Sequence, residues 1–212
     1  MKALIIGATG ATGKDLTAVL LADDFYSEVI IFVRRPSGMV HPKLKEIITN
    51  FDKPEEVAAL IHGDVLFSCL GTTLQAAGSK EKQWQIDHDI PLQFARLAKQ
   101  NGVPHMVLLS AYGAAATSRV FYSRLKGKLE DAIAALGFTC YTVFRPGLLV
   151  RKNTDREGER IGAAVLHFVN KLGLARKFKP LPTEILADKL AKAPKVFSSG
   201  QHVVKLDEIF RF

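Results

Sequence analysis

Three residues in the middle of the sequence have the types and spacing needed for acid–base chemistry on a carbonyl or an alcohol. Tyr122 and Lys126 are four residues apart in a predicted helix, so their side chains share one helix face. A phenol with a pKa of about 10 is a poor acid or base at neutral pH, and a nearby ammonium favours the phenolate. Ser110 ends a predicted strand twelve residues before Tyr122 and could hydrogen-bond a substrate carbonyl. Taken alone, Tyr122 and Lys126 are better explained as an ordinary helix pair, so the case for chemistry depends on the elements around them.

Three glycines spaced three apart follow the first apolar run, in the stretch IIGATGATGKDL. Because glycine costs backbone entropy, Gly7, Gly10 and Gly13 together indicate a close approach to the backbone. A turn between a strand and a helix would need only one of them. A phosphate cradle would use the free N–H groups and the dipole of a helix N-terminus. A Walker A loop is excluded, because Asp15 stands where that motif needs Ser or Thr after its lysine.

Apolar runs alternate with helix-like stretches along most of the chain. The expected strands are 3–6, 29–33, 46–49, 65–70, 105–110 and 139–144. The expected helices are 14–21, 54–61, 86–101 and 119–135. Most of the strand-like runs are continuously apolar, which is typical of strands buried on both faces of a parallel sheet. We therefore expect an α/β fold, a Rossmann-type doubly wound parallel sheet with the glycines after its first strand.

The length and composition predict one domain. The chain has 212 residues, of which 48% are hydrophobic and 24% charged, as in ordinary globular proteins. We expect residues 1–150 to form a cofactor-binding core and residues 151–212 to form a small substrate-facing segment. The loop after the sixth strand should emerge at the carboxyl edge of the sheet, where ligands bind. The hypothesis that follows is a mobile lid over 151–180, built around an apolar stripe from Ile161 to Leu172, with Thr183 capping a second helix.

The net charge of +8 comes mainly from the end of the chain. Residues 151–212 hold 13 Lys and Arg against 7 Asp and Glu, whereas residues 1–150 hold 16 against 14. This excess would attract an anionic small-molecule substrate or a protein partner, although a solvated face explains it as well. Nucleic acid is an unlikely partner, because no aromatic-studded basic strand or recognition-helix pattern accompanies the charges.

The sequence favours a cytoplasmic protein without a membrane span. No apolar run approaches the roughly 18 residues of a spanning helix, and the first apolar stretch is too short for a signal peptide. Cys69 and Cys140 lie in apolar, strand-like runs and are expected as buried free thiols. One strand should separate them, at roughly 9–10 Å, which exceeds the reach of a disulfide. No feature therefore requires an oxidising compartment.

The residues after the second strand indicate which dinucleotide would bind. A site that prefers NAD carries an acidic residue there for the ribose 2′-hydroxyl. This chain has Arg34 and Arg35, whose guanidinium groups can hold a 2′-phosphate by charge-assisted hydrogen bonds. Two solvated arginines on a loop are the alternative. We expect NADP, as NADPH in the reduced form.

Taken together, these features resemble a known superfamily. The glycine spacing, the two arginines, the stretches FSCLGTT and FRPG, and the set of Ser110, Tyr122 and Lys126 are similar to the short-chain dehydrogenase/reductase superfamily. Within its atypical branch the chain resembles the TIP30-like (HIV Tat-interacting protein 2) oxidoreductase-like family. The resemblance runs from the start to about Gly147 and more loosely to the C-terminus.

The resemblance implies a set of site residues. The residues expected along the pyrophosphate are Gly7, Thr9, Gly10, Ala11, Thr12 and Gly13. The remaining cofactor contacts expected are Arg34 and Arg35 at the 2′-phosphate, Asn50 and Phe51 at the adenine, Leu70, Gly71 and Thr72 beneath the ribose, Pro146 near the nicotinamide, and Tyr122 and Lys126. Asn50 departs from the acidic residue more usual at that position.

Two functions are compatible with these expectations. The first is an NADP-dependent oxidoreductase acting on a small carbonyl or alcohol, with Ser110, Tyr122 and Lys126 as its catalytic residues. The second is a non-catalytic NADP(H)-binding protein that senses redox state and acts through a protein partner. No metal is expected, because the contiguous residues Asp87, His88 and Asp89 point in different directions and better suit a helix start.

Overall fold

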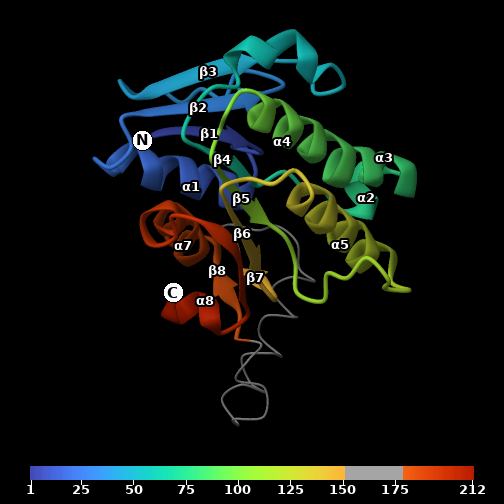
Figure 1. Ribbon diagram of the computed structural model, residues 1–212. Helices are drawn as coiled ribbons and strands as arrows, with labels where there is room; N and C mark the ends of the chain where they lie inside the picture. Colours follow the sequence, from blue (N-terminus) through green and yellow to red (C-terminus); the bar gives the residue numbers. More distant parts are fainter. Residues whose placement is uncertain (151–178) are drawn as a thin grey trace.

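The computed structural model describes residues 1–150 and 179–212, which fold around a central parallel sheet (Figure 1). The sheet contains β1 (Lys2–Ile6), β2 (Glu28–Val33), β3 (Leu44–Ile48), β4 (Val65–Ser68), β5 (His105–Leu109), β6 (Cys140–Arg145) and β9 (Gly200–Lys205). The strands lie in the order β3-β2-β1-β4-β5-β6-β9, and each neighbouring pair is parallel. The winding reverses between β1 and β4, the switch point of a Rossmann-type sheet. The expected fold class is confirmed.

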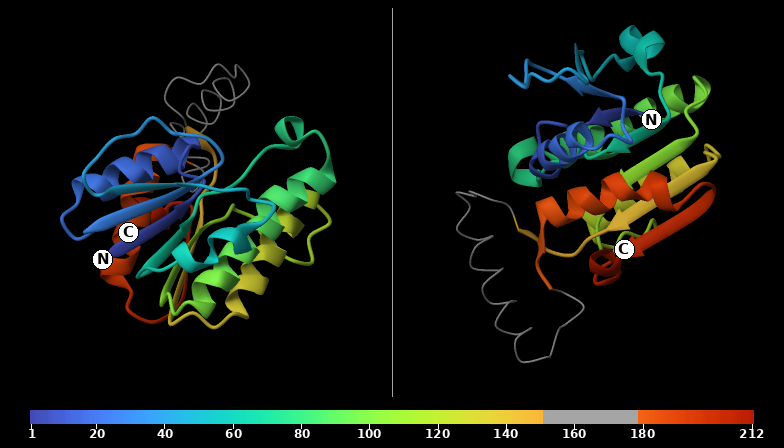
Figure 2. Two further views of the ribbon diagram at one scale, coloured as in Figure 1. Left: turned by 90° about the horizontal axis from the view of Figure 1, so that it is seen from above. Right: turned by 90° about the vertical axis from the view of Figure 1, so that its left-hand side faces the viewer.

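Helices cover both faces of the sheet, as the view from above shows (Figure 2). One face carries α1 (Ala11–Ala22) and α7 (Thr183–Val196), which contact each other. The other face carries α4 (Ile90–Gln100), α5 (Phe121–Ala134) and the 3₁₀ helix η1 (Pro54–Leu60). The short elements are α2 (Leu74–Ala77), α3 (Lys80–Trp84), the π-helical turn η2 (Gln85–Asp89) and α8 (Glu208–Arg211).

Two hydrophobic cores lie on opposite faces of the sheet. Alternate residues of β1 point into different cores, with Leu4 and Ile6 in one and Ala3 and Ile5 in the other. The first core is completed by α4 and α5 and the second by α1 and α7. Because the central strands are buried on both faces, their sequences are continuously apolar. These cores hold the carboxyl ends of the strands rigidly at one edge.

The structure corrects several expected elements. In place of the expected helix 54–61, residues 54–60 form a 3₁₀ helix, and the expected helix 86–101 is divided into η2 and α4. The strand β9 was not expected, and it pairs with β6 as the seventh strand. Thr183 is the first residue of α7 and not its cap, which is Pro182 without a side-chain hydrogen bond.

The end of the chain completes the fold. The Tyr26 hydroxyl donates to the Ala191 carbonyl oxygen at 2.6 Å and so fastens α7 to the first half of the chain. A second, two-stranded sheet pairs β7 (Leu149–Val150) with β8 (Leu181–Pro182). Residues 179–212 are thus part of the main fold. The expected stripe from Ile161 to Leu172 lies outside the described residues, as does nearly all of the proposed lid over 151–180.

Both cysteines are free, as predicted, but only Cys140 is buried, and Cys69 is partly exposed. Cys69 directly follows β4, Cys140 begins β6, and β5 lies between these strands. In the part of the chain that the structure describes, no helix is long and apolar enough to cross a membrane.

Candidate cofactor and active site

Two of the three glycines allow β1, α1 and the end of β4 to pack closely. Gly7 has a φ of +82°, and a Cβ placed there would lie 2.5 Å from the backbone nitrogen of Leu70. A Cβ on Gly13 would lie 2.0 Å from the carbonyl oxygen of Gly7. Both distances are far below van der Waals contact, so no larger residue fits without displacing backbone. A turn that needed one glycine does not explain this arrangement.

The remaining glycine, Gly10, directly precedes α1 and lines a cleft. Gly10 is the N-cap of α1 and has no side chain to bond the first N–H groups of the helix. Gly10, Ala11 and Thr12 line the cleft. The opposite wall contains the expected residues Leu70, Gly71 and Thr72. Free N–H groups and the helix dipole make this position suitable for a phosphate group. Thr9 is exposed on the preceding loop.

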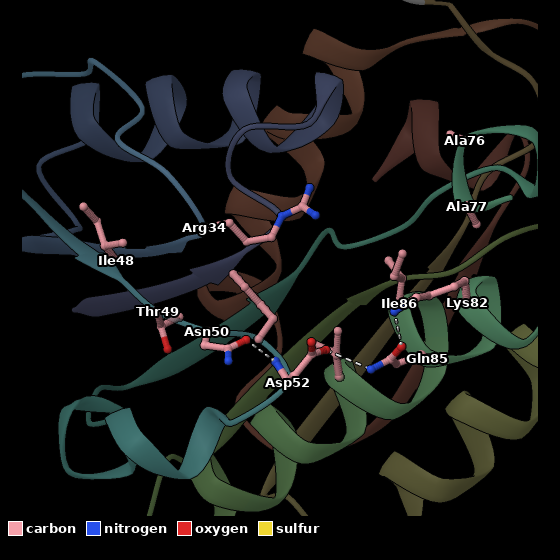
Figure 3. Close-up of a pocket in the computed structure, with 12 residues that line it drawn as sticks. Arg34, Ile48, Thr49, Asn50, Asp52, Ala76, Ala77, Lys82, Gln85 and Ile86 are labelled. Atoms are coloured by element: carbon pink, nitrogen blue, oxygen red, sulfur yellow. Dashed lines mark hydrogen bonds between the residues drawn. The ribbon is translucent and has the colours of Figure 1, made fainter.

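A second pocket lies at the carboxyl ends of β2 and β3 (Figure 3). Arg34 extends over this pocket, and Asn50 and Phe51 belong to its wall, as expected. Arg35 is exposed and is not among the lining residues. Sequence reasoning did not identify Asp52 or Gln85, which close the pocket. The Gln85 side-chain amide donates to Asp52 Oδ1 at 2.8 Å.

The three expected catalytic residues line the same cleft as the start of α1. Ser110, Tyr122 and Lys126 all lie on its wall. The Lys126 ammonium is 6.0 Å from the centre of the Tyr122 ring, so the helix places the two as their spacing predicts. Tyr122 is 40% exposed, whereas Lys126 is 3% exposed, so the phenol faces the cleft mouth above a buried cation. Pro146 is buried and does not line the cleft, but Leu149 after it does.

The Ser110 hydroxyl has a buried partner that the sequence did not indicate. It donates a hydrogen bond to Glu130 Oε1. The Arg145 guanidinium in turn donates to both carboxylate oxygens of Glu130, at 3.1 Å and 3.0 Å from Nε, and forms an ion pair with it. The Glu130 carboxylate raises the pKa of the Arg145 guanidinium. A buried Glu130 carboxylate, paired with the partly exposed Arg145, therefore stands directly behind the serine.

Asp87 is a second buried carboxylate behind the cleft. It is fully buried, and its Oδ1 accepts from the Thr72 backbone N–H at 2.7 Å. Within residues 1–150 and 179–212, its Oδ2 has no hydrogen-bond partner. A Cβ on Gly71 would lie 3.8 Å from both Asp87 Oδ2 and Lys126 Nζ, so the carboxylate and the ammonium lie near one another. Burial raises the pKa of the Asp87 carboxyl, and the charge of Lys126 partly offsets that effect. Asp87 lies within η2, directly before α4, and its neighbour Asp89 is the N-cap of that helix.

The remaining ionisable groups do not suggest thiol or metal chemistry. Cys69 lines the cleft, but burial raises the pKa of its thiol to about 12. At neutral pH it is therefore the protonated thiol, which is a poor nucleophile. Within residues 1–150 and 179–212, no cluster of three or more His, Cys, Asp and Glu could hold a metal ion.

Comparisons with known proteins identify the family. The model of the NAD(P)H-binding family matches residues 7–169. The chain belongs to this NAD(P)H-binding family. It is 34% identical over 184 residues to protein FMP52, mitochondrial, of Eremothecium gossypii, which covers 85% of this chain and 80% of that protein. It is 36% identical over 178 residues to protein HTATIP2 of Rattus norvegicus, which covers 82% of this chain and 68% of that protein.

A solved structure supports the fold of this NAD(P)H-binding chain. A short-chain dehydrogenase/reductase superfamily protein from Agrobacterium tumefaciens, with bound NAD, matches with a TM-score of 0.72 at 12% identity. The match covers 97% of this chain and 77% of that one. The expected resemblance is therefore confirmed. The chain is an NAD(P)H-binding protein similar to FMP52 and HTATIP2, and its fold is that of the short-chain dehydrogenase/reductase structure.

Proposed function

We propose that this protein is an NADP-dependent oxidoreductase that acts on a small carbonyl or alcohol substrate. The observation that carries the proposal is that one cleft joins the start of α1 to Ser110, Tyr122 and Lys126. A site that only bound a dinucleotide would not need a phenol above a buried ammonium at one end. Family membership supplies the cofactor class, and the cleft supplies the reason to expect chemistry.

The residues of the two pockets fit a dinucleotide. The close approach that Gly7 and Gly13 permit leaves room for a pyrophosphate against the free N–H groups of α1. Phe51 and Ile90 offer apolar surface to an adenine. Arg34 lies beside them without a carboxylate partner in the ion pairs of the described residues, so its guanidinium suits a 2′-phosphate. We therefore propose NADP(H) over NAD(H).

Tyr122 and Lys126 would have different roles in the proton transfer. A bound nicotinamide would exchange hydride with the carbon of the substrate. Tyr122 would give its proton to the carbonyl oxygen during reduction and take it back during oxidation. The buried charge of Lys126, one helix turn away, stabilises the phenolate that remains. Val120 and Phe121, which also line the cleft, would limit access of water.

The test is a panel of aldehydes and ketones with NADPH, read by the loss of the nicotinamide absorbance. The wild-type protein should reduce at least one of them. Tyr122→Phe should lower kcat by about a hundredfold or more, the usual contribution of a positioned acid. Tyr112→Phe is the matched control, because Tyr112 is exposed and does not line the cleft.

Other outcomes would favour the alternative function. Tight binding of NADPH with no turnover on any carbonyl would contradict the enzyme and support a redox-sensing protein that acts through a partner. The partner, an anionic substrate and a cytoplasmic location stay predictions. The FMP52 protein of Eremothecium gossypii is named mitochondrial.

A further inference from the structure

The Glu130 carboxylate stands at the inner end of the catalytic helix face. It lies four residues beyond Lys126 and eight beyond Tyr122, so α5 presents all three on one face. Glu130 is 5% exposed, and Ser110, at the end of β5, is also 5% exposed. Arg145, at the end of the neighbouring strand β6, reaches the same carboxylate. Three elements thus converge on one buried acid directly behind the serine.

The bonding of Glu130 fixes the direction of the Ser110 hydroxyl. An ionised carboxylate only accepts hydrogen bonds, and the Glu130 carboxylate forms an ion pair with Arg145, which donates to both of its oxygens. The single hydroxyl hydrogen of Ser110 therefore points to Glu130. What the serine offers to the cleft is its oxygen lone pairs, which accept hydrogen bonds and cannot donate them. A plain carbonyl oxygen, which also only accepts, gains nothing from this serine.

We propose that Glu130, held by Arg145, is a positioning residue that makes Ser110 a hydrogen-bond acceptor, so that the cleft selects carbonyl substrates with a hydroxyl on the neighbouring carbon. This inference rests on the proposed function. The substrate hydroxyl donates to Ser110 Oγ, and Tyr122 remains the donor to the carbonyl oxygen. Leu109 and Leu149, which line the same cleft as Ser110, have apolar side chains that neither donate nor accept hydrogen bonds.

The first test compares two ligands that differ by one hydroxyl group. A ketone that the panel shows to be reduced is paired with the same ketone carrying a hydroxyl on the neighbouring carbon. The hydroxyl is tertiary, so NADP⁺ can neither reduce the carbonyl nor oxidise the alcohol, and the dissociation constants are measured by calorimetry in the presence of NADP⁺. The hydroxy ketone should bind the wild-type protein about two- to tenfold more tightly, the usual value of one neutral hydrogen bond. Ser110→Ala should abolish that preference.

The second test changes the direction of the Ser110 hydroxyl hydrogen and keeps the serine in place. In Glu130→Gln, the side-chain oxygen faces the guanidinium of Arg145, because that group only donates. The amide NH₂ then donates to Ser110 Oγ, so the hydroxyl hydrogen of Ser110 can point toward the cleft. The preference should therefore disappear or reverse in favour of the plain ketone, and steady-state KM values should shift in the same direction. A merely structural role for Glu130 would weaken both ligands equally.

The outcomes are distinguishable. Equal binding of the two ketones by the wild-type protein, or an unchanged preference in Ser110→Ala, overturns the inference and leaves the proposed oxidoreductase standing. If Glu130→Gln does not fold, as judged by circular dichroism, the wild-type and Ser110→Ala comparison decides alone. If no carbonyl is reduced or bound, the proposed function fails and the inference fails with it.

Discussion

Arg34 and Arg35 are adjacent in sequence, but only Arg34 lines the pocket at the ends of β2 and β3. We therefore expect substitution of Arg34 to affect NADPH binding much more than substitution of Arg35. Arg34→Ala should weaken NADPH binding by about ten- to a hundredfold, since a hydrogen bond to a charged group contributes roughly 1.5–3 kcal/mol. NADH lacks the 2′-phosphate and should bind nearly as before. Fluorescence titration of both cofactors measures this difference.

Arg35→Ala is the matched control for that measurement. It removes a guanidinium of the same kind from an exposed position that does not line the pocket. A larger loss in Arg35→Ala than in Arg34→Ala would mean that the loop is arranged differently when NADPH binds. Equal weakening of NADPH and NADH by Arg34→Ala would contradict the assignment of NADP.

Burial of Asp87 gives a prediction about pH. Its pKa is raised in the folded protein, so the folded state favours the neutral carboxyl more than the unfolded state does. Stability from this group is present below its unfolded pKa of about 3.9 and is lost as pH rises through the folded pKa. Asp87→Asn does not titrate. The free energy of unfolding of Asp87→Asn, relative to wild type, should therefore increase with pH.

Urea unfolding of both proteins at several pH values measures that trend. The asparagine keeps an oxygen that can accept from the Thr72 N–H, so the local hydrogen bond survives in the variant. A difference that stayed constant with pH, or decreased, would show that Lys126 compensates the Asp87 charge fully.

The residues that the sequence did not reveal share a physical property. Tyr122 and Lys126 follow from helical spacing, and Arg34 follows from its place after a strand. Glu130 and Asp87 are charged residues in helical stretches, and charge on a helix usually indicates a solvated face. Only tertiary packing shows that Glu130 and Asp87 are buried. Sequence periodicity cannot show which charged face is turned inward.

At the scale of the elements, the glycine turn is the most constrained contact. Gly13→Ala would place a methyl group 2.0 Å from the Gly7 carbonyl oxygen, so β1 and α1 must separate. We expect a loss of about 1–3 kcal/mol or more in the free energy of unfolding, as for an overpacked core. Gly10→Ala is the control, because the nearest atom to its Cβ is 3.3 Å away. Urea unfolding of both variants compares them.

Two results would contradict that account of the turn. One is a Gly13→Ala protein as stable as wild type, and the other is a Gly10→Ala protein that loses more stability than Gly13→Ala. Either would mean that α1 can shift along the sheet at little cost, and that the position of its N-terminus is not fixed by glycine packing.

Element prediction succeeded in the sheet interior and failed at its edges. The central strands are continuously apolar because helices cover both their faces. The edge strand β9 reads GQHVVK, and Val204 is its only buried residue, so it has no apolar run to recognise. The other edge strand, β3, begins with the mixed pair Leu44 and Lys45 and was expected two residues too late. Edge strands acquire their structure from one neighbour, which the local sequence does not specify.

At the scale of the molecule, the candidate site is assembled from segments far apart in the chain. One pocket takes residues after β2 and β3, and the other takes residues from α1, from the loop after β4, from β5 and from α5. Both sets of residues come together because the carboxyl ends of parallel strands meet at one edge of the sheet. The sequence therefore predicted the position of the candidate site more completely than it predicted the buried residues Glu130 and Asp87 behind it.

The central claim is that hydride passes between NADPH and a substrate in the cleft that holds Ser110, Tyr122 and Lys126. The most direct measurement uses NADPH deuterated at C4 in a single turnover with a carbonyl from the panel, and mass spectrometry of the product. The account predicts an alcohol that carries deuterium on the former carbonyl carbon, formed about a hundredfold or more slowly by Tyr122→Phe. An unlabelled product, or equal rates for wild type and Tyr122→Phe while NADPH still binds, would contradict it.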